Sequence, residues 1–149
     1  MRFAHTNIVS KDWRKLVAFY TLTFQCKLVP PVRKQSGAWL EKGTGLQNAA
    51  LEGAHLLLPG YGEKGPTLEI YQYDSIEEQD KPFPNHQGFG HIAFEVENVA
   101  EIAETLIQNG GTLAGKITQK EVKGVGKITF VYARDPEGNL IELQQWKYD

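Results

Sequence analysis

Residues 89–95 read FGHIAFE and residues 140–146 read LIELQQW, and both stretches have a counterpart earlier in the chain. Residues 3–9, FAHTNIV, match the first, and residues 67–73, TLEIYQY, match the second. The first member of each pair places a His in a strand-like run, and the second places a Glu in one. Because this order occurs twice, the chain is predicted to contain two copies of one structural module.

The first half of the chain reads as a strand, a helix and then several strands. The helix is predicted to follow the N-cap candidates Ser10 and Asp12, with Trp13, Leu16, Val17 and Tyr20 along one face. Pro30-Pro31 is predicted to end that unit. Further strands are predicted around residues 36–41, 54–58 and 68–73, separated by turns that are rich in glycine.

The second half repeats this order. Asn98 is predicted to cap a helix with one apolar face, formed by Val99, Ile102, Ala103 and Leu106, and Gly110-Gly111 is predicted to end it. Strands are predicted at residues 116–122, 128–133 and 140–146, with a tight turn at residues 135–139.

The predicted fold class is therefore α+β, with two βαβββ modules in tandem. We place the first module at residues 1–73 and the second at residues 88–149. An acidic segment, residues 74–87, contains two prolines and is predicted to be the linker between them. Together they form a single domain, residues 1–149, which is the usual number for a chain of this length.

The composition is that of a globular protein and excludes several classes of partner. Of 149 residues, 41% are hydrophobic and 23% are charged. A net charge of −2 argues against nucleic acid or an anionic membrane, because phosphate binding requires a dense basic surface. No run is apolar and long enough to span a bilayer, and residues 1–5 lack the apolar core of a signal peptide. The single cysteine, Cys26, cannot form an internal disulfide and is expected to pack as a small apolar residue, so a cytoplasmic location is expected.

The repeated glutamates are predicted to lie on the polar faces of their strands. In both strands the aliphatic neighbours point one way, and Glu69 or Glu142 points the other way. An unpaired carboxylate that faced the core would be costly, so both are predicted to line a concave, solvated cleft. Two imidazoles and two carboxylates suit Zn, Ni, Fe, Mn or Co. The predicted metal ligands are His5, Glu69, His91 and Glu142.

The remaining histidines and the aromatic residues receive weaker assignments. His55 and His86 have no counterpart in the repeat and are interpreted as structural or loop residues. Four aromatic residues are candidates for the walls of the cleft, namely Trp39, Tyr71, Tyr73 and Trp146.

The whole chain resembles the vicinal oxygen chelate superfamily, the glyoxalase, bleomycin resistance protein and extradiol dioxygenase family. The resemblance is sharpest in three places: the opening strand around His5, the stretch FGHIAF at residues 89–94, and the stretch DPEGNLIEL at residues 135–143. These motifs are specific for the superfamily but not for the reaction. The resemblance implies that the paired modules form a curved mixed β-sheet around a metal-binding cleft.

The ligand pattern is most similar to that of bacterial glyoxalase I. This similarity implies a divalent metal ion, Zn or Ni before Fe, Mn or Co, and a lyase or isomerase that transfers a proton next to a carbonyl through a metal-bound enediolate. It implies Glu142 as the first choice of catalytic base and Glu69 as its counterpart on the other face of the substrate. The substrate would be a small molecule with adjacent oxygens.

Two features leave the use of glutathione open. Glutathione recognition in glyoxalase I relies on an Arg a few residues after the first His and on an Asn shortly after the first Glu. The matching neighbourhoods here, residues 7–10 and 71–73, read NIVS and YQY and contain neither residue in place.

Other members of the superfamily supply alternative functions. An extradiol dioxygenase would use His5, His91 and Glu142 as a triad of ligands around Fe(II). Glu69 would then be a fourth ligand that fills a coordination site needed for oxygen. A drug-binding protein of the bleomycin resistance type needs no metal quartet, so the intact quartet counts against it. Relatives build their sites within one chain or across a dimer, and a homodimer is expected here.

Overall fold

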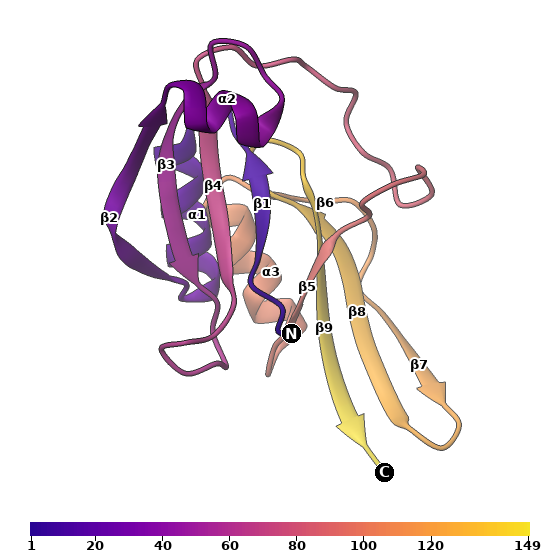
Figure 1. Ribbon diagram of the computed structural model, residues 1–149. Coiled ribbons are helices and arrows are strands. Elements are labelled where there is room, and N and C mark those ends of the chain that lie inside the picture. Colours follow the sequence, from indigo (N-terminus) through magenta and orange to yellow (C-terminus); the bar gives the residue numbers. More distant parts are fainter. The chain divides into compact units, whose positions relative to one another are not determined.

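A computed structural model describes residues 1–149, which divide into two compact units. Unit 1 spans Met1–Gln79 and unit 2 spans Asp80–Asp149. Each unit contains one mixed β-sheet and a long helix that packs against it (Figure 1). The predicted α+β class with two βαβββ modules is thereby confirmed. No helix in the structure combines the length and the apolar character needed to cross a membrane.

The first strand of unit 1 is an edge strand of its sheet. One long helix packs against the strands that follow. Its elements are β1 (His5–Val9), α1 (Trp13–Phe24), β2 (Lys27–Ser36), α2 (Ala38–Thr44), β3 (Ala50–Leu57) and β4 (Thr67–Tyr73). The strand order is β1-β4-β3-β2. β1 runs parallel to β4, whereas the other neighbours are antiparallel. The first and last strands of the unit are therefore hydrogen-bonded partners.

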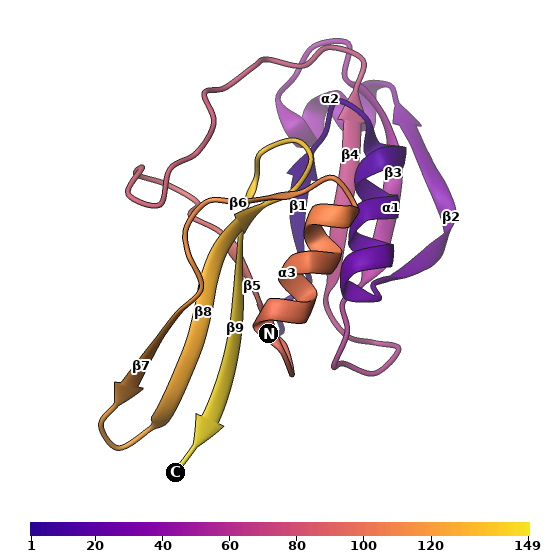
Figure 2. The same cartoon turned by 180° about the vertical axis from the view of Figure 1, so that it is seen from behind.

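Helix α1 closes one face of this sheet, as the sequence predicts. Asp12 caps it by accepting a hydrogen bond from the backbone N–H of Lys15, at 3.1 Å. Leu16, Phe19 and Tyr20 are at most 2% exposed, and the helix packs against β3 and β4 (Figure 2). The sheet contributes Ala54, Leu56, Leu68 and Ile70 to this core, all at most 1% exposed.

The predicted strand at residues 36–41 is wrong, because a short helix, α2, occupies most of that segment. Gly37 and Gly45 both have positive φ, at 93° and 74°, and so allow the chain to turn sharply at each end of α2. Leu40 is 6% exposed and packs with Ala49 and Leu51. The segment is therefore anchored by the burial of Leu40 in this cluster, which alternation along the sequence does not show.

Contrary to the prediction, the Pro30-Pro31 pair does not end a unit. It lies inside strand β2. The pairing register between β2 and β3 shifts between Val29 and Arg33, which places both prolines in a bulge. β2 is also an edge strand, with a neighbouring strand on one side only. The backbone N–H that proline lacks therefore leaves no carbonyl group of a second neighbour without a donor.

Unit 2 repeats the plan with an interrupted strand. Its elements are β5 (Ile92–Glu95), α3 (Val99–Gln108), β6 (Thr112–Leu113), β7 (Thr118–Val122), β8 (Gly126–Arg134) and β9 (Leu140–Tyr148). The strand order is β5-β9-β8-β6, and β7 also pairs with β8. β5 runs parallel to β9, which matches the pairing of β1 with β4.

Helix α3 also behaves as predicted. The side chain of Asn98 accepts hydrogen bonds from the backbone N–H groups of Ala100 and Glu101, at 3.0 and 3.3 Å. The chain leaves the helix at Gly110, whose φ is 94°. The buried residues of the helix and of the strands that it contacts form the core of the unit, namely Val99, Ala103, Leu106, Val131, Ala133, Ile141 and Leu143.

Cys26 follows α1 and is 1% exposed, which confirms that it packs in the apolar interior. Burial raises the pKa of its thiol to about 12, although a hydrogen bond from its own backbone acts in the opposite direction. The thiol is therefore protonated at neutral pH and is not a nucleophile.

The turn before β9 is held by one buried carboxylate, Asp135, which is 3% exposed. It accepts hydrogen bonds from the backbone N–H of Glu137 and from both the backbone and the side-chain N–H of Asn139, at 2.8–3.0 Å. The turn sets the start of the strand that carries Glu142.

We expect Asp135→Ala to lower the free energy of unfolding by about 1–3 kcal/mol, because it leaves partly buried donors without acceptors. Urea denaturation of the purified protein measures this change, with Asp80→Ala, an exposed residue of the same unit, as the control. A loss below about 0.5 kcal/mol, within the range of ordinary surface substitutions, would contradict this account of the turn.

Candidate functional site

In unit 1, the first and last strands bring His5 and Glu69 together. Asn7 of β1 lies opposite Glu69 of β4, and His5 lies two residues earlier on the same face. The Nδ1 atom of His5 is 3.3 Å from Oε1 of Glu69. The side chain of Glu69 is 12% exposed and that of His5 is 48% exposed, so solvent reaches the pair mainly from the His5 side.

In unit 2, the corresponding strands bring His91 and Glu142 together. His91 directly precedes β5, and Ala93 of that strand lies opposite Glu142 of β9. The Nε2 atom of His91 is 2.9 Å from Oε2 of Glu142. The ring of Tyr132 lies 5.0 Å from the ring of His91 and supports it from β8.

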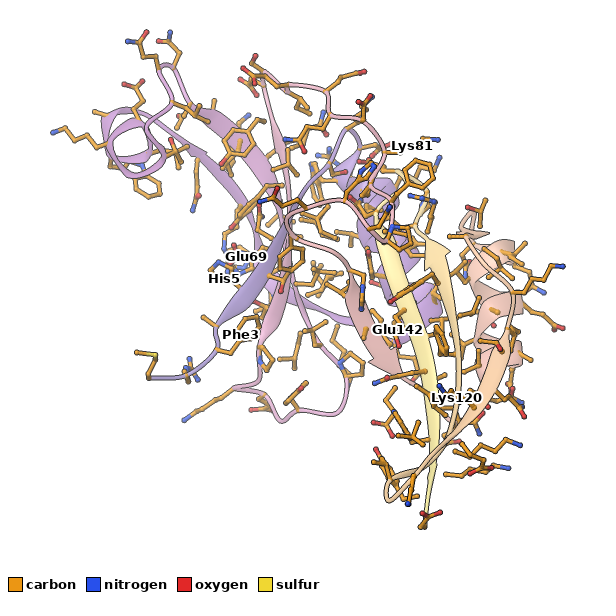
Figure 3. All side chains as sticks on the ribbon, turned by 90° about the vertical axis from the view of Figure 1, so that its right-hand side faces the viewer. Phe3, His5, Glu69, Lys81, Lys120 and Glu142 are labelled. Atoms are coloured by element: carbon orange, nitrogen blue, oxygen red, sulfur yellow. The ribbon has the colours of Figure 1, made fainter.

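Both glutamates lie on the sheet face opposite the helix, as alternation predicts. Their strand neighbours Leu68, Ile70, Ile141 and Leu143 are at most 1% exposed and belong to the cores. Figure 3 shows His5 and Glu69 close together on β1 and β4, and Glu142 on β9. The same polar pair therefore occupies the same position in each module.

Sequence reasoning missed a further neighbour of Glu69. His55 of β3 lies directly opposite Glu69, and its Nε2 atom is 3.4 Å from Oε1 of Glu69. The same Nε2 atom is 2.5 Å from the hydroxyl oxygen of Tyr71. Alternation along the predicted strand at residues 54–58 places His55 on one face of the strand and the apolar residues Ala54 and Leu56 on the other. Only the pairing register, which the sequence does not show, places it beside Glu69.

The surroundings of His55 and Tyr71 favour their neutral forms. Burial lowers the pKa of His55, while the charge of Glu69 acts in the opposite direction and the charge of Arg33 adds to the lowering. Burial also raises the pKa of Tyr71, and the charge of Glu69 adds to this effect. The other unassigned histidine, His86, lies in the loop before β5, as predicted, and accepts a hydrogen bond from the backbone N–H of Phe83.

Three of the four aromatic candidates lie on strands that carry a site glutamate. Tyr71 and Tyr73 follow Glu69 on the same face of β4, and Trp146 follows Glu142 on the same face of β9. Tyr73 packs against the cluster around Leu40. Trp39 lies on α2 and is 62% exposed.

The paired modules, each with a His and a Glu on its first and last strands, match a known family along nearly the whole chain. The family model of the Glyoxalase/Bleomycin resistance protein/Dioxygenase superfamily matches residues 2–143. The chain belongs to this superfamily. The resemblance found in the sequence is therefore confirmed.

Within the superfamily, the chain is similar to proteins named lactoylglutathione lyase. The protein of this name from Salmonella typhimurium is 30% identical, over 99% of this chain and 94% of the relative. Glyoxalase I from Zea mays has a TM-score of 0.65 and 26% identity, with 99% of this chain and 45% of that chain covered. A glyoxalase family protein from Bacillus cereus shares the fold, with a TM-score of 0.77, 23% identity, and 98% and 93% of the two chains covered.

The side chains of this superfamily member fit a divalent metal ion by their chemistry. Each pair offers an imidazole nitrogen and a carboxylate oxygen, the donor types that bind Zn and Ni, and neither carboxylate is sealed from solvent. Neither unit by itself gathers three or more His, Cys, Asp or Glu side chains in positions that hold an ion. Binding of one ion by His5, Glu69, His91 and Glu142 together stays a prediction.

Proposed function

We propose that the protein is a metal-dependent lyase or isomerase of the glyoxalase type, which moves a proton at a carbon next to a carbonyl. The observation that carries this proposal is the repeated pair: His5 with Glu69 at 3.3 Å, and His91 with Glu142 at 2.9 Å. Similarity to lactoylglutathione lyases over 99% of the chain supports the same reaction class. The four residues would hold the ion, and Zn or Ni is the first expectation.

The bound ion would act as a Lewis acid toward the oxygens of the substrate. The chain itself supplies the proton acceptor, and we assign this role to Glu142. Its carboxylate contacts one imidazole, that of His91, whereas the carboxylate of Glu69 contacts two, those of His5 and His55. Glu142 thus has fewer imidazole partners than Glu69, which suits a group that must take up and return a proton.

We propose a small substrate with two adjacent oxygen atoms. The identity of its thiol component is left open. The segment that follows Glu69 supports a departure from glutathione. Tyr71 contacts His55 through its hydroxyl group, and Tyr73 packs beside Leu40 and Leu51. These aromatic side chains take part in the packing of unit 1 and do not present an amide to a peptide-like thiol.

Metal reconstitution followed by an assay with several thiols tests the proposed function. The apoprotein is loaded with Ni, Zn or Fe(II) and mixed with 2-oxoaldehyde hemithioacetals of glutathione or of smaller thiols. We expect Ni or Zn to support formation of the 2-hydroxyacyl thioester, with at least one thiol as substrate. Absence of turnover with every thiol, together with oxygen uptake by the Fe(II) protein in the presence of catechols, would instead favour a dioxygenase.

A further inference from the structure

The two repeated glutamates are held differently, although their strands are equivalent. In unit 1 both His5 and His55 approach the same carboxylate oxygen, Oε1 of Glu69, at 3.3 and 3.4 Å. The second oxygen of that carboxylate lies outside these contacts. In unit 2 the residue directly opposite Glu142 is Tyr132, and its ring packs against His91.

His55 is itself fixed in place by Tyr71. The hydroxyl oxygen of Tyr71 is 2.5 Å from Nε2 of His55, and the two rings meet edge to face with centroids 5.7 Å apart. Gly53 lies opposite Tyr71 in the register and leaves room for its ring. A Cβ atom at Gly53 would lie 2.7 Å from Cδ1 of Tyr71 and would overlap the carbonyl oxygen of Ile70. This position therefore requires glycine.

The contacts of Nε2 with two oxygens are compatible with either tautomer of His55, because the Tyr71 hydroxyl group can donate to an unprotonated Nε2 or accept from Nε2–H. If Nε2 were unprotonated, its lone pair would face the carboxylate of Glu69. A proton on Nε2 can instead be donated into the space between the Tyr71 hydroxyl oxygen and Oε1 of Glu69. Only the Nε2–H tautomer gives the carboxylate of Glu69 a donor from His55.

We propose that His55, held by Tyr71, is a positioning residue for Glu69. The Nε2–H group draws Oε1 toward β3 and so fixes the rotation of the carboxylate about its Cγ–Cδ bond. The contact itself does not depend on any reaction, whereas its consequence for metal binding rests on the function proposed above. Partners that orient a ligating carboxylate typically change metal affinity by about 10- to 100-fold when they are removed.

Three variants separate positioning from a general effect on structure. His55→Leu removes the donor at similar volume, His55→Gln restores an N–H near the place of Nε2, and Tyr71→Phe releases His55. We expect His55→Leu to weaken the affinity for Ni or Zn, measured by competition with a chromophoric chelator, by about 10- to 100-fold. His55→Gln should recover most of this loss, and Tyr71→Phe should give an intermediate value.

The matched control is His86→Leu, which changes a loop histidine of unit 2 in the same way. It should bind metal as the unchanged protein does. Equal affinities of His55→Leu, His55→Gln and the unchanged protein would overturn the proposal. So would an X-ray absorption spectrum with three imidazole ligands, because His55 would then be a ligand itself.

A measurement on the apoprotein tests the contact without any metal. Nitrogen-15 NMR of the imidazoles should show the Nε2–H tautomer for His55. Glu69→Gln should shift these signals, whereas Glu63→Gln, in the loop between β3 and β4, should not. An Nδ1–H tautomer, or no response to Glu69→Gln, would refute the contact. If the protein binds no metal but gives both NMR results, the proposed function is contradicted, whereas the contact between His55 and Glu69 is supported.

Discussion

Replacing Glu142 by Gln is expected to lower kcat by about 100- to 10,000-fold, which is the range for loss of a general base. The amide has nearly the same size as the carboxylate, but it cannot accept a proton from carbon at neutral pH. Its carbonyl oxygen can still accept a hydrogen bond from Nε2 of His91, the partner that lies 2.9 Å from the carboxylate. Circular dichroism and the urea midpoint should therefore stay close to those of the unchanged protein.

The control for this substitution is Glu104→Gln, an exposed position on helix α3. It should retain full activity, because α3 covers the face of the sheet that is opposite Glu142. Initial rates at saturating substrate, with metal content measured on the same samples, give the comparison. Full turnover by Glu142→Gln with normal metal content would remove this residue from the proton transfer.

The second large effect is expected from His91→Ala, which should weaken Ni or Zn binding by at least about 100-fold. His91 is a proposed ligand, and loss of an entire ligand should exceed the 10- to 100-fold effect of removing a residue that merely orients one. The substitution also leaves Glu142 without its imidazole partner and Tyr132 without the ring it packs against. Dialysis against a chelator of known affinity, followed by metal analysis, measures the change.

His86→Ala is the natural comparison, since it removes an imidazole from a loop of the same unit. Free imidazole added to His91→Ala should restore part of the metal content, because it can occupy the vacated space. Unchanged metal binding by His91→Ala would mean that the repeated pairs are structural ion pairs and do not ligate a cation.

The sequence predicts the duplicated fold well because the signals that define it are local. The caps Asp12 and Asn98, and the spacing of apolar residues behind them, specify α1 and α3 without reference to the rest of the chain. Alternation likewise predicts which face of the strand carries Glu69 and which carries Glu142. The pairing of each glutamate with a histidine followed from the repeat, since equivalent residues occupy equivalent places.

The wrong predictions, and the neighbour of Glu69 that the sequence does not reveal, concern features that depend on contacts between separate elements. α2 forms where Leu40 finds a buried position against Leu51, and β2 continues through two prolines because it is an edge strand with a bulge. His55 lacked a counterpart in the repeat and was interpreted as structural. Its place beside Glu69 arises from the register between β3 and β4, and Tyr132 occupies the equivalent place in unit 2.

The parallel pairing of β1 with β4 and of β5 with β9 also has a consequence for the expected order of folding. Each His–Glu pair joins the opening strand of a unit to its final strand, and so closes the longest loop in that unit. We expect such contacts to form late in folding, because the entropy of a long loop must be overcome before they contribute. During synthesis the first pair can assemble only once β4 has emerged from the ribosome, and the second only once β9 has emerged. Cation capture by these pairs would therefore follow folding of the modules and would not nucleate it.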